Sequence, residues 1–379
     1  MILGIDATNI IKGGGITHLK EILNFPEEFE LYFDKIYIWS NAKTLDIIPD
    51  HPLYLKKHHP VFEKSIFKRI IWRKFFFTKI LNEFKVDLLF MPGGPSGVKF
   101  APKVTMSRNM HPYVWKELLR YSFLTFFFYK YLLIRLFQPS SFKKFDAIIF
   151  LNEFVKNYMI KLISKYKGKT EIIAHGINSS FFYDGRQFKP ISEYTISNKF
   201  KILYVSKIDV HKHQSKVAKA ILELFQEGYP IEITFIGSID DKRSYNILNK
   251  QIEHDKNGIL KYLDDINHND LYKFYNQSDL FVFASSCENL PNILLEAMSN
   301  KIPIACSSTS PMPEILKDGG TYFNPESVTE IKLAVKSLLE SVELRKKVSE
   351  RSFEISSTYS WKKCAAATAF FLHKSILTQ

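Results

Sequence analysis

The chain has 379 residues, of which 46% are hydrophobic and 24% charged, and this composition excludes a fibrous or disordered protein. Its length is sufficient for two domains. The net charge is +13, and the excess lies in the first half, because residues 1–190 hold 29 Lys and Arg against 16 Asp and Glu, whereas residues 191–379 hold 23 of each. Such a basic half is either a solvated lysine-rich surface or a face that meets anionic lipid, a phosphate-bearing substrate or nucleic acid.

The chain opens at residues 2–6 with an apolar run that predicts a strand. No basic and apolar leader precedes this strand, so we expect no signal peptide. The three cysteines, Cys287, Cys306 and Cys364, are odd in number and far apart, which is typical neither of a disulfide framework nor of a zinc site. Together these features indicate a cytoplasmic protein.

Short β-branched and aromatic runs then alternate with amphipathic stretches along the chain, a pattern that predicts parallel sheets covered by helices. Amphipathic stretches lie, for example, at residues 213–226, 268–276 and 290–299. The predicted strands are residues 2–6, 35–39, 86–91, 103–106, 146–151, 171–174, 201–206, 231–236, 259–263, 279–284, 302–306 and 321–323.

This α/β series runs twice, and it lapses at residues 183–199 into a stretch that contains Gly185, Pro190, Ser192 and Ser197. We interpret that stretch as an interdomain linker, which places a first domain at residues 1–185 and a second at residues 199–359. Doubly wound domains bind ligands at the carboxyl ends of their strands, so the candidate sites are sought there.

Two further stretches are unusually apolar. Residues 64–80 interleave bases with aromatic residues, and residues 121–137 are interrupted only by Lys130 and Arg135. The second stretch is short for a bilayer span. Both stretches either lie in a membrane interface or form ordinary helices that pack on the sheet.

Two carboxylates flank a predicted helix start in residues 285–298. Pro291 suits the first turn of a helix, because its missing N–H is not needed there. The free N–H groups around residues 289–292 would then form an anion site suited to a diphosphate. Glu288 precedes this site, and Glu296 lies one turn beyond Asn292 on the same helix face. One carboxylate can therefore take sugar hydroxyls and the other ribose hydroxyls, although a charged first turn with a surface glutamate would give the same pattern.

Two lysines, Lys207 and Lys212, bracket the loop that follows the predicted strand at residues 201–206. Cations at this position could neutralise a leaving diphosphate. The intervening His211 and His213 form an H-x-H pair, but no carboxylate or cysteine ligand accompanies them at useful spacing, so we expect no metal site here.

Five segments, in chain order, resemble motifs of the retaining nucleotide-sugar glycosyltransferases of family 4, which have the GT-B fold. Residues 288–298 resemble the E-x7-E signature with its following Ala-Met, and residues 206–212 resemble the Gly-Arg…Lys phosphate clamp. The other three are residues 172–181 (the I-P-H-G-I-D-x-x-F segment), 310–314 (the Gly-rich turn and Glu) and 359–361 (the Ser-Trp opening of the last helix). The resemblance implies two facing Rossmann-like domains, with a C-terminal helix at about residues 360–379 that crosses back to close the first.

The resemblance also implies roles in binding the donor. Lys207 and Lys212 would bind the diphosphate, Glu288 the sugar hydroxyls and Glu296 the ribose. The backbone of Asn289, Leu290 and Pro291 would meet the phosphates, and the backbone at Tyr262 and Leu263 would meet the base. Ser206-Lys207 replaces the usual Gly-Arg, and Asn289-Leu290 replaces the usual Gly-Phe-Gly, so the identity of the donor sugar does not carry over.

The acceptor side is expected in the first half of the chain. Gly13, Gly14 and Gly15 follow the first strand, and a glycine loop lets backbone approach an anion or a sugar closely, unless it is a plain flexible turn. Residues 107–113 resemble an R-N-M-x-P-[FY] segment of polysaccharide-assembling members, which makes Asn109 and His111 acceptor-side candidates, with turn capping as the alternative role of His111.

These features predict a glycosyltransferase that moves a sugar with retention from a nucleotide sugar to a glycan or lipid-linked sugar, in bacterial surface polysaccharide or lipopolysaccharide biosynthesis. The chain contains no Asp-x-Asp, and two lysines can supply the charge, so no metal or other cofactor is expected. An anionic membrane surface is a further expected partner of the basic half, at the inner face of the cytoplasmic membrane, and nucleic acid is not. The alternatives are a sugar-nucleotide epimerase of the same fold and a non-catalytic basic protein that binds membranes or nucleic acid.

Overall fold

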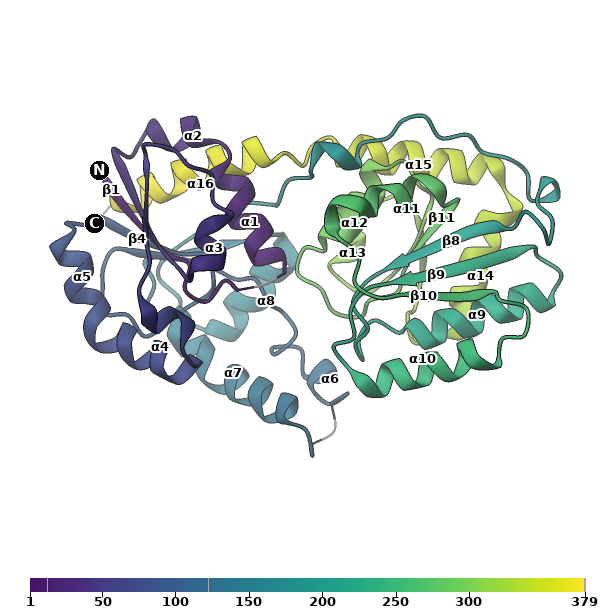
Figure 1. Cartoon of the computed structure of the whole chain (residues 1–379), viewed down its shortest axis with the longest axis horizontal. Helices are drawn as coiled ribbons and strands as arrows, with labels where there is room; N and C mark the ends of the chain where they lie inside the picture. Colours follow the sequence, from purple (N-terminus) through teal and green to yellow (C-terminus); the bar gives the residue numbers. More distant parts are fainter. Residues whose placement is uncertain (12, 122, 378–379) are drawn as a thin grey trace. The chain divides into compact units, whose positions relative to one another are not determined.

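The computed structural model describes residues 1–11, 13–121 and 123–377. Contacts divide the chain into two compact units, which are considered separately below. The first unit comprises Met1–Tyr113, Tyr129–Gly176 and Tyr359–Gln379, and the second comprises Val114–Phe128 and Ile177–Thr358. Both units are α/β, with helices packed against one parallel sheet (Figure 1).

The sheet of the first unit has seven strands in the order β3-β2-β1-β4-β5-β6-β7, and all of its pairs are parallel. In its centre Ile5 of β1 lies opposite Ile38 of β2 and Phe90 of β4, and all three side chains are buried. The strands are β1 (Ile2–Asp6), β2 (Lys35–Trp39), β3 (Tyr54–Lys57), β4 (Leu88–Met91), β5 (Lys103–Met106), β6 (Ala147–Phe150) and β7 (Lys169–Ile172).

Strand β3 was not predicted, because its Tyr-Leu-Lys-Lys sequence has little of the apolar character that marks the central strands. It is an edge strand that pairs only with β2, and edge strands tolerate such lysines. The helices of this unit are α1 (Gly14–Leu23), α2 (Pro26–Glu30), α3 (Ala42–Asp46), α4 (Ile66–Trp72), the π-helical segment η2 (Arg73–Phe77), α5 (Thr78–Glu83), α8 (Glu153–Ile163), α16 (Trp361–Ile376) and most of α7 (Phe126–Phe142).

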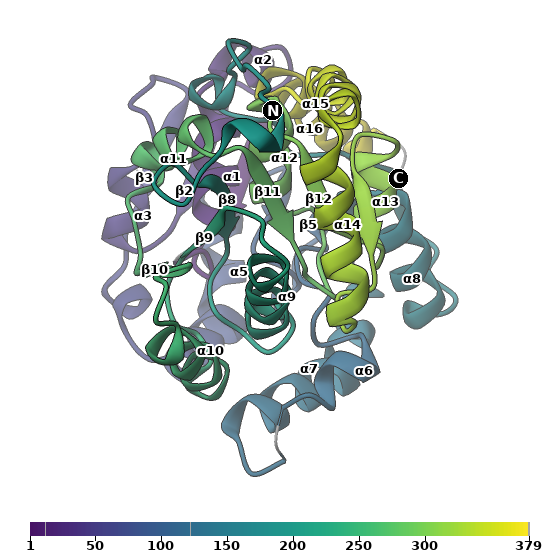
Figure 2. The same ribbon diagram turned by 90° about the vertical axis from the view of Figure 1, so that its right-hand side faces the viewer.

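The second unit contains a six-stranded parallel sheet in the order β10-β9-β8-β11-β12-β13. Helices α9 and α14 lie side by side on it (Figure 2). Its strands are β8 (Phe200–Val205), β9 (Ile231–Ile236), β10 (Leu260–Leu263), β11 (Leu280–Phe283), β12 (Ile304–Ser307) and β13 (Thr321–Phe323). Its helices are α6 (Trp115–Leu118), α9 (Gln214–Gln226), α10 (Lys242–His254), α11 (Leu271–Gln277), α12 (Asn292–Ser299), α13 (Met312–Leu316), α14 (Val328–Glu340) and α15 (Val342–Ser356).

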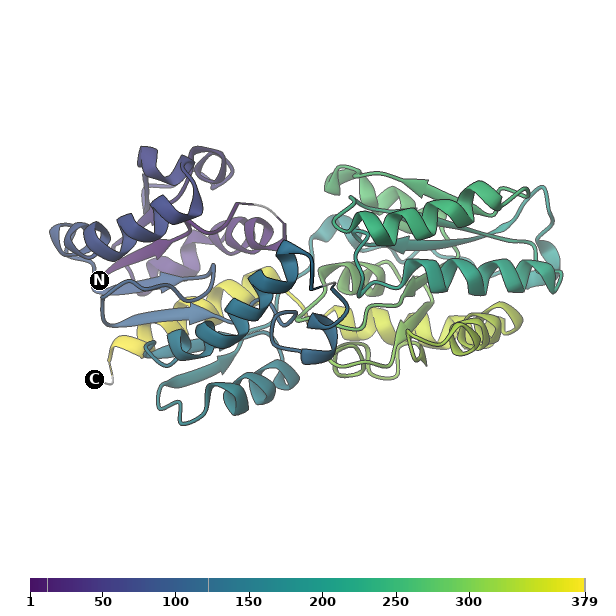
Figure 3. The same ribbon diagram turned by 90° about the horizontal axis from the view of Figure 1, so that it is seen from below.

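The last helix, α16, returns to the first unit and packs on α1, α2 and β4 (Figure 1 and Figure 3, in yellow). At its start the Trp361 ring stacks on His175, with ring centroids 5.5 Å apart. Gly176 makes this approach possible, since a Cβ at that position would lie 2.1 Å from the backbone nitrogen of Trp361. The resemblance of these two segments to a His-Gly and a Ser-Trp motif therefore has a shared structural cause.

The boundary between the units differs from the predicted linker at residues 183–199. The chain leaves the first unit after Gly176 and returns to it at Tyr359, and the segment that follows Gly176 is hydrogen-bonded within the second unit. Tyr183 N–H donates to the Ser299 carbonyl at 3.1 Å, and Arg186 donates to the Tyr275 carbonyl at 2.9 Å. The polar residues that suggested a linker therefore belong to an extended segment of the second unit.

The second departure is that Val114–Phe128 belongs to the second unit, although it lies between two parts of the first in sequence. Tyr121 donates a hydrogen bond from its hydroxyl to Asp209 Oδ1 at 2.9 Å, and Lys116 pairs with Glu326 at 2.9 Å. No local sequence signal marks these contacts, because their partners lie about 90 and 210 residues away.

Candidate functional site

The two predicted phosphate-clamp lysines occupy different environments after β8. Lys212 is buried, its ammonium group forms an ion pair with the Glu288 carboxylate, and it lies 5.3 Å from the centroid of the Phe283 ring. The Lys207 side chain is 46% exposed and pairs with Asp240 at 2.6 Å. Lys212 is therefore held in a buried position at the carboxyl edge of the sheet, whereas Lys207 is exposed to solvent.

Glu288 carries a carboxylate whose side chain is 15% exposed and which remains charged. Burial alone would raise its pKa, but the charges of Lys212 and His211, with hydrogen bonds from Lys212 and Ser285, hold the pKa below its ordinary value. The predicted sugar-binding residue and one predicted phosphate-binding residue thus lie in direct contact. A ligand phosphate that approaches Lys212 would meet an ammonium group already shared with Glu288.

Helix α12 begins at Asn292, two residues later than predicted, and Pro291 is its N-cap. Pro291 has an extended ψ of 109°, so it precedes the first turn and does not form part of it. Having no N–H, Pro291 can offer a phosphate no backbone hydrogen bond, and its carbonyl accepts from Leu294 N at 3.0 Å. The amides of the first turn of α12 remain the donors that a helix start presents to an anion.

Glu296 lies on α12 as predicted and is also buried. Its Oε1 lies 2.8 Å from His268 Nε2, and its Oε2 accepts a 3.4 Å hydrogen bond from the Tyr275 hydroxyl. Sequence analysis did not single out His268 or Tyr275, although both fall in the helical stretch predicted at residues 268–276. Their spacing of seven residues, two helical turns, was the available signal that they share a face.

Tyr262 and Leu263 end β10, at the same edge of the sheet as the lysine loop. The Tyr262 hydroxyl donates to the Gly237 carbonyl at 3.0 Å, and burial followed by the charge of Asp264 raises its pKa to about 12. This side chain therefore links the ends of β9 and β10, beside the exposed Leu263.

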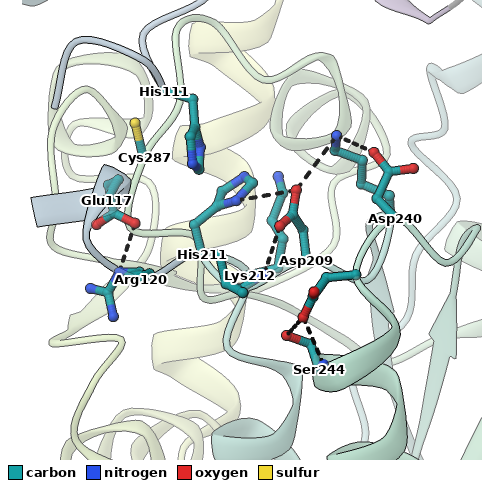
Figure 4. Close-up of polar contacts among 12 residues, drawn as sticks. His111, Glu117, Arg120, Asp209, His211, Lys212, Asp240, Ser244 and Cys287 are labelled. Atoms are coloured by element: carbon teal, nitrogen blue, oxygen red, sulfur yellow. Dashed lines mark hydrogen bonds and ion pairs between the residues drawn. The ribbon is translucent and has the colours of Figure 1, made fainter. Parts of the chain in front are cut away.

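Asp209 is a buried carboxylate in the lysine loop that sequence analysis missed. It accepts hydrogen bonds from Tyr121 at 2.9 Å and from Val210 N at 2.7 Å, and His211 Nδ1 lies 3.6 Å from it (Figure 4). Burial would raise its pKa, but the hydrogen bond and charge of His211, the charge of Lys207 and the hydrogen bond from Tyr121 lower it. One histidine of the H-x-H pair is thus engaged with a carboxylate.

The other histidine, His213, caps α9 with a left-handed φ of 52°. Its Nε2 lies 3.1 Å from the Ser286 hydroxyl, which links the β8 loop to the β11 loop. Burial, together with the charge of Arg120, lowers the pKa of His213 to about 3, so the ring is neutral at physiological pH. Beside it, Arg120 pairs with Glu117 at 2.7 Å.

The predicted acceptor-side residues lie in the first unit. Gly13 has a φ of 71° and caps α1 without a side-chain hydrogen bond, so the loop requires glycine there. In the loop after β5, the Asn109 Oδ1 accepts a 3.0 Å hydrogen bond from His111 N, so the turn-capping side chain is Asn109. The His111 ring lies 5.2 Å from that of Tyr131.

Known proteins resemble this chain both in sequence and in fold. Residues 185–354 match the family described as glycosyl transferases group 1. O-antigen chain mannosyltransferase B from Escherichia coli is 23% identical over 181 residues, which cover 47% of this chain and 47% of that protein. The chain thus spans about half the length of that curated relative.

Two solved structures match nearly the whole chain. Sucrose-phosphate synthase (tll1590) from Thermosynechococcus elongatus has a TM-score of 0.74 at 14% identity, over 99% of this chain and 98% of that one. Anabaena Alr3699/HepE, in complex with UDP and glucose, has a TM-score of 0.69 at 16% identity, over 99% of this chain and all of that one. The two predicted Rossmann-like domains are confirmed, the chain has the GT-B fold, and its residues 185–354 match the group 1 glycosyl transferase family.

Proposed function

We propose that the chain is a retaining glycosyltransferase of family 4, which moves a sugar from a nucleotide sugar to a glycan or a lipid-linked sugar. The observation that carries this proposal is the ion pair of the buried Lys212 with Glu288 at the carboxyl edge of the second sheet, next to the start of α12. The names of the relatives support a role in surface polysaccharide assembly, since one is an O-antigen chain mannosyltransferase.

In this reaction the bond between the anomeric carbon and a phosphate oxygen breaks, and a bond from that carbon to the acceptor oxygen forms. The acceptor's hydroxyl proton passes to the departing phosphate. The main requirement is therefore stabilisation of negative charge on the diphosphate, for which the Lys212 ammonium group and the amides at the start of α12 are suited. Glu288 would hold sugar hydroxyls while it keeps Lys212 in place.

The same argument leads us to propose that no metal is needed. Lys207 would exchange its exposed partner Asp240 for a donor phosphate, at little cost because surface ion pairs are weak. Glu296, fixed by His268 and Tyr275, would present its carboxylate to the ribose.

A thermal-shift screen against UDP-, GDP-, ADP- and dTDP-sugars tests this donor site. At about 100 times its dissociation constant, one true ligand should stabilise the protein by about 2.7 kcal/mol, and EDTA should not change that shift. Glu296→Ala should lose the shift, whereas Lys336→Met, which alters an exposed pair with Glu227, should keep it. A screen in which no nucleotide sugar shifts the wild type would contradict the proposal.

We also propose that the first unit docks on an anionic membrane through α4 and η2. In this stretch Arg69 and Arg73 are buried, whereas most of the large apolar residues are exposed and only Phe77 is fully buried among those that the structure describes. Arg69 donates to the Thr8 carbonyl at 2.8 Å, and Arg73 donates to Asn9 at 2.9 Å. The exposed apolar residues are Phe67 (75% exposed), Ile70, Ile71, Phe75 (66%) and Phe76.

The charge of this surface favours anionic lipid. Between Glu63 and Glu83 there is no acidic residue, and Lys64, Lys68 and Lys74 are exposed with no ion pair among the described residues. Apolar side chains at the headgroup boundary with lysines beside them fit interfacial binding. In the described part of the chain, no helix combines the length and apolar character needed to cross a bilayer.

Co-sedimentation with phosphatidylglycerol–phosphatidylcholine vesicles tests this surface. Lys68→Gln combined with Lys74→Gln should weaken binding about 30-fold at low salt, since each lysine near such a surface contributes about 1 kcal/mol. Phe67→Ser with Phe75→Ser should weaken it at all salt concentrations. Leu333→Ser, which removes a comparably exposed residue of α14, serves as the control. Equal binding to vesicles by all these variants would exclude this surface.

A further inference from the structure

A cavity of about 270 Å³ lies in the second unit, beside the starts of α9 and α10. Every residue that the structure assigns to its lining belongs to this unit. Small-molecule cavities commonly range from about 300 to 1,000 Å³, so this one suits a ligand the size of one phosphorylated sugar better than a whole nucleotide sugar. Its lining includes Arg120, Asp209, His213, Ser215, Lys216 and Arg243, of which Arg120 and Asp209 are labelled in Figure 4.

Three cations from three segments line this cavity: Arg120 after α6, Lys216 on α9 and Arg243 on α10. Arg120 is shared between the carboxylates of Glu117 and Glu326. The Lys216 ammonium group donates to the Glu326 backbone carbonyl at 2.6 Å and has no carboxylate partner among the described residues. Arg243 is exposed, and within the described part of the chain its side chain forms no hydrogen bond and no ion pair. Two of the three positive charges are therefore available to an anion.

The acidic and histidine side chains at this point do not cancel that charge. Asp209, the carboxylate of the described lining, already accepts a hydrogen bond from Tyr121 at 2.9 Å and lies 3.7 Å from the Lys207 ammonium group. Burial and then the charge of Arg120 lower the pKa of His213 to about 3, so its ring is neutral in a positive neighbourhood. A ligand that brings its own negative charge is therefore favoured here.

The cavity is separate from the proposed donor site. As far as the described residues go, its lining contains none of Lys207, Lys212 and Glu288, and no residue of α12. Two further features fit a sugar that carries a phosphate. The Ser215 hydroxyl makes no hydrogen bond with the described residues, and Ile247, which is 47% exposed, gives an apolar wall against which the carbons of a sugar ring can pack.

We propose that this cavity binds a phosphorylated monosaccharide, with Lys216 and Arg243 on its phosphate, as a ligand distinct from the nucleotide-sugar donor. Charge-assisted hydrogen bonds from an ammonium group and a guanidinium suit phosphate oxygens. The Ser215 hydroxyl would then meet a sugar hydroxyl. This inference goes beyond the proposed function, because it concerns a second ligand and does not depend on the identity of the donor.

Calorimetric titration of the full chain with glucose 6-phosphate and with inorganic phosphate tests the cavity. Lys216→Met combined with Arg243→Met should weaken the binding of both at least about tenfold, since both charge-assisted contacts are lost. Lys219→Met combined with Lys242→Met is the matched control. It removes the same charge from exposed positions of α9 and α10 that lie outside the described lining, and it should bind like the wild type.

Absence of phosphate binding in the wild type, or an equal loss in the two double variants, would overturn the inference. So would binding of phosphatidic acid vesicles that depends on Lys216 and Arg243 without any binding of glucose 6-phosphate, because the ligand would then be a lipid headgroup. The nucleotide-sugar screen separates this inference from the proposed function. A shift that is lost in Lys216→Met with Arg243→Met would assign the cavity to the donor and reject a second ligand. Phosphate binding that depends on these two residues, in a protein that no nucleotide sugar stabilises, would retain the cavity and reject the transferase.

Discussion

Replacement of Lys212 by methionine is expected to lower kcat about 100- to 1000-fold. The buried ammonium group is the cation best placed to stabilise the departing diphosphate, and removal of one such preorganised donor typically costs about 2.7–4 kcal/mol of transition-state stabilisation. Steady-state turnover with the donor identified by thermal shift measures the effect. Lys336→Met should leave kcat unchanged, and undiminished turnover in Lys212→Met would remove the lysine from the mechanism.

The same substitution should destabilise the fold, because it leaves the largely desolvated Glu288 carboxylate without its partner. Loss of one member of a buried pair typically costs about 3–5 kcal/mol. Glu288→Gln added to Lys212→Met should recover much of this stability but no turnover. That double variant separates the catalytic effect from unfolding, and assays well below the unfolding temperature do so for the single variant.

The contribution of Glu288 to the pH dependence of the unfolding free energy should also reverse its sign in Lys212→Met. In the wild type Lys212 lowers the pKa of Glu288, so the pair's stabilisation is present at neutral pH and is lost as the pH falls through that lowered pKa. Without Lys212, burial dominates and raises the pKa, so the variant is relatively more stable when the carboxyl is protonated. The difference in unfolding free energy between the two proteins should therefore shrink from pH 7 to pH 4.

Much of the fold could be predicted from the sequence, because buried parallel strands are short apolar runs whose character is local. The exception, β3, is an edge strand in which two of the four residues are lysines. That Lys212 and Glu288 of the proposed donor site lie near one another could also be predicted, since they follow strands whose carboxyl ends meet at one edge. Their direct ion pair was not, because it joins residues 76 apart in the chain.

The direction in which side chains point explains why another feature could not be predicted from the sequence. In residues 64–80 the alternation of bases and aromatics was visible, but whether the arginines or the phenylalanines point inward depends on Asp6, Asn9 and the Thr8 carbonyl.

Gly176→Ala is expected to lower the free energy of unfolding by at least about 2 kcal/mol, the scale of strain when an atom is forced into a well-packed region. The added Cβ would lie 2.1 Å from the Trp361 nitrogen and 2.5 Å from its Cα, and backbone cannot swing aside as a flexible side chain can. The start of α16 must therefore shift, and with it the stacking of Trp361 on His175.

Urea unfolding monitored by circular dichroism measures this loss, and limited proteolysis shows whether α16 becomes accessible. Gly97→Ala is the matched control, because no atom lies within 4 Å of its added Cβ, and it should unfold like the wild type. Equal midpoints for Gly176→Ala and Gly97→Ala would mean that α16 does not pack at this point. A loss confined to Gly176→Ala would instead explain why a glycine follows the histidine at the end of the first unit: it is the residue that admits the returning helix.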